Sequence, residues 1–485
     1  MNPILEHRRH LTRREFLGRT SLGLGTAALA SLWGKDVGAA TAVGDSPVLG
    51  LTHFAPKAKR VIYLFQNGGP THVELFDGKP TLAAMHGQPV PESFVRGKRF
   101  STMTGKADGK LMLGPVEPFQ RHGQSGATVS RFLPHIAGVA DELCFVKSMH
   151  TDAVNHAPAI SLLLSGGQIP GRPTMGAWLN YGLGSANENL PSYVVMTSVT
   201  KNTTCGQIFY DFYWGAGFLP SRHQGVKFRG KGEPVLYLSN PPGQSRALRR
   251  GVLDDLAQIN ARHYEEYGDP EIVSRIAQYE MAYRMQTSVP DLTDFSDESE
   301  ATLAMYGPDV REQGTFAYNC LMARRLIERD VRFVQLMHAG WDQHNSITTE
   351  LYNQCRDTDQ ASAALVRDLK QRGLLDDTLV IWGGEFGRTP FIQGKLEERK
   401  RWGRDHHPYA FTIWMAGGGI QPGMSYGATD ELSMNAVTNP VHVHDLQATV
   451  LHLLGIDHER LTFKHQGRRF RLTDVHGQVV KDLIA

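Results

Sequence analysis

The sequence has few cysteines, and they form no arrangement that binds metal. The four cysteines, Cys144, Cys205, Cys320 and Cys355, lie far apart and make no C-x-x-C pair. This spacing argues against a cysteine zinc site and against a disulfide-dense scaffold. We expect buried free thiols, with one or two bridges as the alternative in an oxidising compartment.

Two further absences narrow the class of protein. No segment approaches eighteen consecutive apolar residues, so we expect no transmembrane segment in the mature protein. No G-x-S-x-G elbow follows any predicted strand, and this argues against a serine hydrolase.

The N-terminus has the pattern of an export signal. Arg13 and Arg14 precede a short, weakly apolar run, Ser21–Ala30, and small residues follow at positions 40–42. Paired arginines ahead of such a run are typical of a cleavable twin-arginine signal. We therefore predict a signal peptide over residues 1–42, transport by the twin-arginine export machinery, and a periplasmic or otherwise exported protein.

The chain also lacks a strong charge of one sign once this signal is removed. Residues 1–42 carry six basic and three acidic residues, so the formal net charge changes from +2 to −1 in the mature chain. A near-neutral chain gives no electrostatic reason to bind nucleic acid, and we predict no nucleic-acid partner.

Short apolar runs rich in β-forming residues alternate with helical patterns along the rest of the chain. This alternation predicts an α/β fold with a mostly parallel central sheet and helices on both faces. No linker is evident, so residues 43–485 are predicted as a single domain, with Ser288–Glu300 as a solvated loop. The predicted strands are Arg60–Gln66, Glu142–Ser148, Ser192–Met196, Val331–Met337, Thr378–Trp382 and Phe411–Ala416. The predicted helices are Ala157–Leu164, Arg246–Arg284, Thr315–Arg329, Leu351–Arg372 and His444–Leu454.

Polar residues suited to metal binding follow several of these strands. Asp342 and His344 flank one residue after the strand at Val331, so both side chains can point the same way. Glu385 follows two glycines after the strand at Thr378, and His406 precedes the strand at Phe411. Open α/β sheets bind ligands at the carboxyl ends of their strands. Because zinc-like metals take histidine and carboxylate ligands from separated loops, these four residues predict a metal site.

The segment between the second strand and its helix is a candidate for the reacting group. It runs from His150 to Gly166 and includes Thr151 and His156 at the predicted start of a helix. A polar group there faces the positive end of the helix dipole, which suits an anion or an activated nucleophile. Ordinary helix capping by Asp152 or Asn155 explains the same residues, and both interpretations stay open.

The motifs together resemble a known family. The runs TRREFLG, NGGPTHVELFD, NHAPAISLLLSGG, GRPTMGAW, GWDQH, GGEFGRTP, GRDHHPYAFTIWMAGGG and VHDLQATVLHLLG occur in this order. They resemble the family called domain of unknown function 1501, which is similar to sulfatases and belongs to the alkaline phosphatase-like superfamily. The resemblance covers nearly the whole mature chain and implies an alkaline phosphatase-like core.

The resemblance also implies a site and a reaction. One or two divalent metals, zinc, calcium or similar, would support hydrolysis of phosphate or sulfate esters. Asp342 and His344 match an Asp/His metal pair, Glu385 matches the place of an Asp-His-Gly ligand motif, and His406 matches the last ligand histidine. Glu74, Asp77 or Asn67 would stand in for the carboxylate after the first strand.

The sequence departs from the superfamily pattern in ways that change the expected chemistry. His156 stands at the nucleophile position of the sulfatase motif Cys/Ser-x-Pro/Ala-x-Arg, and Ile160 stands at its arginine. Formylglycine cannot be made from this segment. Phe386 replaces a ligand histidine and Asn67 replaces the strand-end aspartate, so we expect one metal or an altered second site.

We therefore predict an exported metal-dependent hydrolase of phosphate or sulfate esters, with a sulfated or phosphorylated carbohydrate as one candidate substrate. In this hypothesis His156 or Thr151 meets the ester, and Arg388 or Arg404 holds its anionic oxygens through a guanidinium fork. The alternative hypothesis is a non-catalytic protein that binds metal or an anionic glycan on the same fold.

Overall fold

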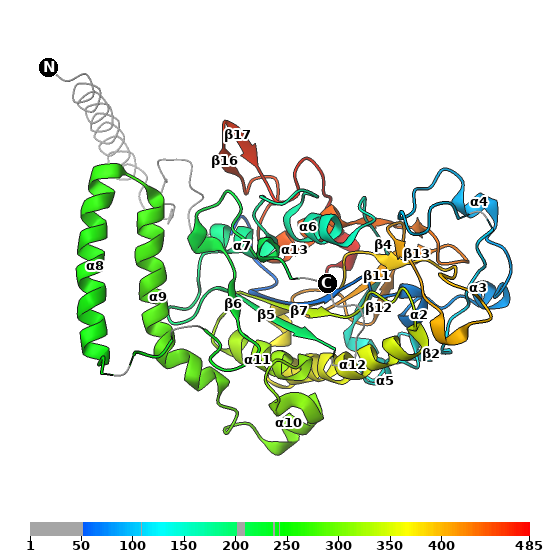
Figure 1. Ribbon diagram of the computed structural model, residues 1–485, viewed down its shortest axis with the longest axis horizontal. Helices are drawn as coiled ribbons and strands as arrows, with labels where there is room; N and C mark the ends of the chain where they lie inside the picture. Colours follow the sequence, from blue (N-terminus) through cyan, green and yellow to red (C-terminus); the bar gives the residue numbers. More distant parts are fainter. Residues whose placement is uncertain (1–51, 108, 201–208, 236–237, 242) are drawn as a thin grey trace. The chain divides into compact units, whose positions relative to one another are not determined.

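A large, mostly parallel sheet organises the chain (Figure 1). The computed structural model describes residues 52–485 except 108, 201–208, 236–237 and 242, so the predicted twin-arginine signal lies outside the described residues. The described residues fall within one compact unit, 49–485, and the predicted domain bounds of 43–485 stay a prediction. The sheet has the strand order β12-β4-β11-β8-β1-β7-β5-β6, and β15 pairs with β4.

The strands of this sheet confirm the predicted α/β class. β1 pairs in parallel with β7 and β8, β5 pairs in parallel with β7 and β6, and β11 runs antiparallel to β4 and β8. Each predicted strand is present, with ends shifted by up to three residues. The strand bounds are β1 (Arg60–Asn67), β4 (Cys144–His150), β5 (Tyr193–Val199), β6 (Val226–Phe228), β7 (Phe333–Ala339), β8 (Thr378–Gly383), β11 (Phe411–Ala416), β12 (Met424–Tyr426) and β15 (Val441–His442).

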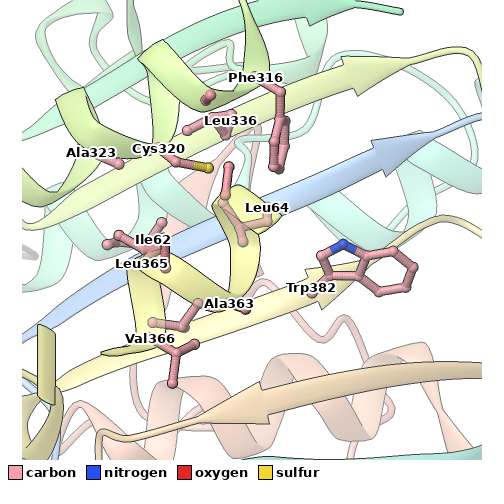
Figure 2. Close-up of a cluster of buried hydrophobic side chains, with 14 of the residues drawn as sticks. Ile62, Leu64, Phe316, Cys320, Ala323, Leu336, Ala363, Leu365, Val366 and Trp382 are labelled. Carbon is pink, nitrogen blue, oxygen red and sulfur yellow. The ribbon is translucent and has the colours of Figure 1, made fainter. Parts of the chain in front are cut away.

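Helices cover both faces of the sheet, and this explains why its strands are continuously apolar. One face packs against α11 (Phe316–Glu328) and α12 (Ile347–Gln371). Figure 2 shows this core, where Leu64 of β1 lies near Cys320 of α11. The other face packs against α6 (His156–Ser165), α7 (Met175–Leu183) and α13 (Val443–Leu453).

Shorter elements surround this core. The remaining helices that bear on the arguments below are α2 (His72–Leu75), α3 (Pro80–Ala84), α4 (Glu92–Val95), α5 (Pro134–Ala137) and α10 (Glu300–Tyr306). Four two-stranded ribbons complete the strands, β2 (Phe119–His122) with β3 (Ala127–Ser130), β9 (Gly387–Arg388) with β10 (His406–His407), β13 (Ala428–Thr429) with β14 (Ala436–Thr438), and β16 (Phe463–His465) with β17 (Arg468–Phe470).

Two sequence predictions are wrong in this part of the chain. The single helix expected over Arg246–Arg284 is a pair of helices, α8 (Arg246–Tyr267) and α9 (Pro270–Thr293). Gly268 ends α8 in the left-handed conformation, with a φ of 66°, and the Asp269 side chain caps α9. The loop expected from residue 288 begins only after Thr293, because α9 continues through Pro290.

Two global properties follow from the described residues. No helix among them has an apolar stretch long enough to cross a bilayer. Cys144, Cys320 and Cys355 are buried free thiols, as expected, whereas Cys205 lies outside the described residues.

Asp359, a buried carboxyl group on α12, should make the stability of the protein depend on pH. Asp359 is 3% exposed and accepts hydrogen bonds from the backbone N–H groups of His135 and Ile136, both at 2.8 Å. Burial raises the pKa of Asp359 to about 7, against the opposing effect of these hydrogen bonds. The folded chain therefore binds a proton between about pH 4 and pH 7 that the unfolded chain has lost, so this group's contribution to stability falls as pH rises.

We expect the Asp359→Asn variant to lack this part of the pH dependence. The free energy of unfolding of the wild type, relative to the variant, should fall by up to about 1.4 kcal/mol per pH unit between pH 4 and 7. Urea denaturation at several pH values measures this difference. Parallel stability curves for the two proteins would contradict the prediction.

Candidate metal centre

Four side chains converge at the carboxyl edge of the sheet. Asp342 and His344 lie in the turn between β7 and α12, His156 is the first residue of α6, and His406 lies in the short strand β10. One ligand atom from each of them lies within 4.8 Å of all the others. We call these residues the His₃Asp group. They come from three segments far apart in the sequence, and the fold brings them together.

The Asp342 carboxylate lies at the centre of the group. Its Oδ1 atom is 2.9 Å from Nε2 of His344, 3.2 Å from Nε2 of His156 and 3.4 Å from Nε2 of His406. The Nε2 atoms of His344 and His406 are themselves 3.0 Å apart. The side chains are between 7% and 15% exposed, so the group is largely buried but not sealed from solvent.

The other ring nitrogen of each histidine contacts an oxygen acceptor. Nδ1 of His344 lies 2.7 Å from Oε1 of Gln393, and Nδ1 of His406 lies 2.9 Å from the carbonyl oxygen of Val154. Nδ1 of His156 lies 2.5 Å from Oε1 of Glu385. In its neutral form, each ring therefore donates its Nδ1 proton to the neighbouring oxygen. The lone pairs of the three Nε2 atoms then point at one place.

This donor set fits a divalent metal. Three imidazole nitrogens and one carboxylate oxygen are a ligand set that zinc accepts, and acceptors on the far ring nitrogens are usual for metal-binding histidines. When His344 and His406 both carry their proton on Nδ1, neither of the facing Nε2 atoms has a proton to donate to the other. A cation between them would be bound by both lone pairs. The geometry therefore satisfies the requirements of a cation site.

Electrostatics favours the ligand forms of two of these side chains. Burial opposes the charged form of Asp342, but the Arg388 guanidinium and the three neighbouring histidines hold its pKa well below the ordinary value. Burial lowers the pKa of His406 to about 4, so the ring is neutral at pH 7. A carboxylate and a neutral imidazole are the forms that bind metal.

His156 has the opposite tendency. Burial would lower its pKa, but hydrogen bonds to Asp342 and Glu385 and the charges of both carboxylates raise it. The ring lies between these two carboxylates, and binding a metal at Nε2 would release the proton held there. Metal affinity at this group is therefore linked to proton release.

Glu385 lies beside the group and supports it. It is fully buried, and its Oε1 atom accepts from the backbone N–H of Gly68 at 3.1 Å and from Nδ1 of His156. The sequence hypothesis gave Glu385 a place among the metal ligands. The structure places it on the far side of the His156 ring, where it orients that ring.

The Arg388 side chain is buried against Asp342 and does not face solvent. Its Nη2 atom lies 2.5 Å from Asp342 Oδ1, and the same nitrogen donates to the carbonyl oxygen of Gly68. Its Nε atom donates to the carbonyl oxygen of Gly69 at 2.9 Å. The side chain is 1% exposed, so it positions Asp342 and has no free fork for an ester oxygen.

The carboxylates after the first strand do not join the His₃Asp group. Glu74 forms a fully buried ion pair with Arg404, whose Nη2 atom is 2.5 Å from Glu74 Oε1. Asp77 forms an ion pair with Lys79 at 3.1 Å and accepts from Thr429. Both lie on the short helix and turn after β1, where a nearby cation and one further donor satisfy each of them: the Val116 N–H for Glu74 and the Thr429 hydroxyl for Asp77.

The two residues expected to meet an ester are Thr151, directly after β4, and His156, at the start of α6. His156 joins the His₃Asp group, and its Nε2 atom faces Asp342. Thr151 is 4% exposed, and its Oγ1 has no hydrogen-bond partner among the described residues. Its backbone N–H donates to the carbonyl oxygen of Pro408, which ties the segment to the loop after β10.

Sequence reasoning missed three residues that complete the site. Gln393 and the Val154 carbonyl orient two histidines, and neither belongs to a recognisable motif. Phe386 packs against the rings of His156 and His406, with centroids 4.9 and 4.7 Å away. The sequence indicates Phe386 only as the loss of a ligand histidine, whereas in the structure its ring forms an apolar wall beside the group.

Three solved structures show a distant likeness to this chain. The sulfatase PsFucS1 from Pseudoalteromonas sp. is 11% identical, with a TM-score of 0.34, over 83% of this chain and 68% of that one. The alkaline phosphatase from the Antarctic bacterium TAB5 is 10% identical, with a TM-score of 0.32, over 82% and 98%. A protein in the alkaline phosphatase superfamily from Vibrio parahaemolyticus is 13% identical, with a TM-score of 0.33, over 86% and 72%. Likeness of this degree carries no argument about the reaction.

Sequence comparison identifies the family of this chain. A search of curated proteins found no match. A family model described as protein of unknown function (DUF1501) matches residues 58–484, which is most of the chain. The chain therefore belongs to this family of proteins of unknown function, DUF1501.

Proposed function

We propose that the protein is an exported, metal-dependent hydrolase of phosphate or sulfate esters with an alkaline phosphatase-like core. One observation carries the metal part of this proposal. Three histidines have their Nδ1 atoms on oxygen acceptors and direct their Nε2 atoms at one oxygen of Asp342. The ester substrate and the export route rest on the sequence motifs, with a sulfated or phosphorylated carbohydrate as one candidate.

The donor set favours zinc or a similar transition metal over calcium. Calcium takes six to eight oxygen ligands, whereas three of the four donors here are imidazole nitrogens. His156, Asp342, His344 and His406 would hold a single ion. Glu385, Gln393 and the Val154 carbonyl would fix the orientation of the three rings.

Each protein group has a definite task in this proposal. A bound divalent metal supplies Lewis-acid stabilisation of charge on the ester and activates water near neutral pH. Asp342 is kept ionised by Arg388, and Glu385 holds the Nδ1 proton of His156. Phe386 limits the access of bulk water on one side of the rings.

Water is the nucleophile in this proposal. Asn155 caps α6 and His156 and Ala157 begin it, so this segment lacks the serine or cysteine of the sulfatase motif. His156 faces Asp342 through Nε2, so it serves as a ligand. Hydrolysis then proceeds without a covalent intermediate on the protein. Water adds to phosphorus or sulfur, the ester bond breaks, and the alcohol leaves with one proton of the water.

Turnover of simple esters tests the proposal. The purified full chain, loaded with Zn²⁺, should release 4-nitrophenol from 4-nitrophenyl phosphate or 4-nitrophenyl sulfate, and a chelator should stop the reaction. The His344→Ala variant should lose activity by at least about 100-fold, because a ligand matters more than the residues that orient ligands. The matched control, His122→Ala on β2, should keep the activity.

The same experiment distinguishes the hydrolase from the alternative hypothesis, a non-catalytic binding protein. Stoichiometric metal without turnover of either ester would favour the non-catalytic binding protein. Turnover that is indifferent to chelator and to His344→Ala would contradict the proposed site.

A further inference from the structure

The outer helix α8 exposes an apolar stripe that the fold leaves uncovered. Of its 22 residues, Leu253 alone is buried. Exposed apolar side chains recur along one side of the helix at spacings of three, four or eight residues. They are Leu248 (57% exposed), Val252 (42%), Leu256 (37%), Ile259 (49%) and Tyr267 (66%).

This stripe is not the side on which α8 meets α9. Arg250 forms an ion pair with Glu280 of α9 at 2.5 Å, and Arg246 donates to the Tyr283 hydroxyl at 3.2 Å. At about 100° per residue, the stripe lies roughly a third of a turn around the helix from Arg246, Arg250 and Leu253. The helix therefore has two separate contact faces, one filled by α9 and one open.

Charges along the open face are arranged in a self-complementary order. Asp255 and Arg262 lie two turns apart on the same edge of the stripe, both are exposed, and neither forms an ion pair with a described residue. An antiparallel partner of the same sequence would bring Asp255 of each copy towards Arg262 of the other.

We propose that α8 pairs antiparallel with α8 of a second copy of this chain. In a two-fold symmetric contact, each residue pair occurs twice, and the same edges of the two stripes meet. When Leu256 of one copy lies opposite Ile259 of the other, Leu248 lies opposite Tyr267. Asp255 of each copy is then within reach of Arg262 of the other. The two helical hairpins together form a four-helix arrangement.

Sedimentation of the full chain tests this pairing. The wild type should sediment as a dimer that dissociates on dilution. Charges placed at the centre of the stripe by Leu256→Glu with Ile259→Glu should give a monomer at the same concentration. The matched control, Gln258→Glu with Ala261→Glu, places the same two charges on other exposed positions of α8 and should leave the dimer intact. Circular dichroism checks that all of these proteins remain folded.

A charge exchange tests the antiparallel direction. Asp255→Arg alone, and Arg262→Asp alone, each place like charges opposite one another and should weaken the dimer at least about tenfold. The double variant, with Asp255→Arg and Arg262→Asp together, should restore it. Failure of the double variant to restore dimerisation would overturn the proposed direction. A wild-type chain that sediments as a monomer at every concentration would overturn the proposal and leave the stripe to a different protein.

Discussion

Replacing Asp342 with asparagine should abolish tight metal binding and also weaken the fold. The carboxylate contacts all three histidines, so its loss removes the one anionic ligand of the group. We expect the affinity for Zn²⁺, measured by competition with a chromogenic chelator, to fall by more than about 100-fold, and ester hydrolysis to fall with it. The exposed Asp376 provides a control, since Asp376→Asn should change neither property.

The same substitution should cost stability through Arg388. Its guanidinium is 1% exposed and would remain buried without its carboxylate partner. Removing one partner of a buried pair typically costs about 3–5 kcal/mol. The double variant Asp342→Asn with Arg388→Met should recover much of that stability but none of the metal affinity. An Asp342→Asn protein with unchanged stability and unchanged zinc affinity would contradict both predictions.

Replacing Arg404 with methionine should destabilise the protein without removing its metal. Arg404 and Glu74 are both fully buried, and the arginine donates to Glu74 through Nε at 2.9 Å and Nη2 at 2.5 Å. The substitution leaves the Glu74 carboxylate buried, and among the described residues only the Val116 N–H, at 2.7 Å, still donates a hydrogen bond to it. We expect a loss of about 3–5 kcal/mol in the free energy of unfolding, measured by urea denaturation.

The metal content of the folded variant separates two roles for Glu74. The sequence hypothesis placed Glu74 among the metal ligands, whereas the structure pairs it with Arg404. The Arg404→Met protein should keep its metal per folded chain, and adding Glu74→Leu should recover part of the lost stability. Loss of metal with little change in stability would return Glu74 to the ligand set.

The fold was largely predictable because its signals are local. Near-continuous apolar runs, such as the one that becomes β1, can be buried only between two layers of helices, and this favours a parallel sheet. The signal for the break between α8 and α9 is also local, but the sequence prediction places one continuous helix there. Gly268, Asp269 and Pro270 are a helix stop, a cap and a first-turn proline in succession, but the amphipathic pattern on either side obscured them.

The site was only partly predictable, since its contacts join distant segments. Strand ends identified Asp342, His344 and His406, because parallel strands bring their carboxyl ends to one edge. No sequence pattern distinguishes Glu74, which meets Arg404 across 330 residues, from a carboxylate that faces the metal. Likewise, His156 was interpreted as a nucleophile from its place in a motif, and only its ring contacts indicate a ligand.

We propose that one divalent metal is held jointly by His156, Asp342, His344 and His406. Metal analysis of the purified, dialysed chain by plasma mass spectrometry tests it most directly. We predict one zinc-like ion per wild-type chain, and none in a folded variant with His344→Ala and His406→Ala. Equal metal content in the two proteins, or no metal in the zinc-treated wild type, would contradict it.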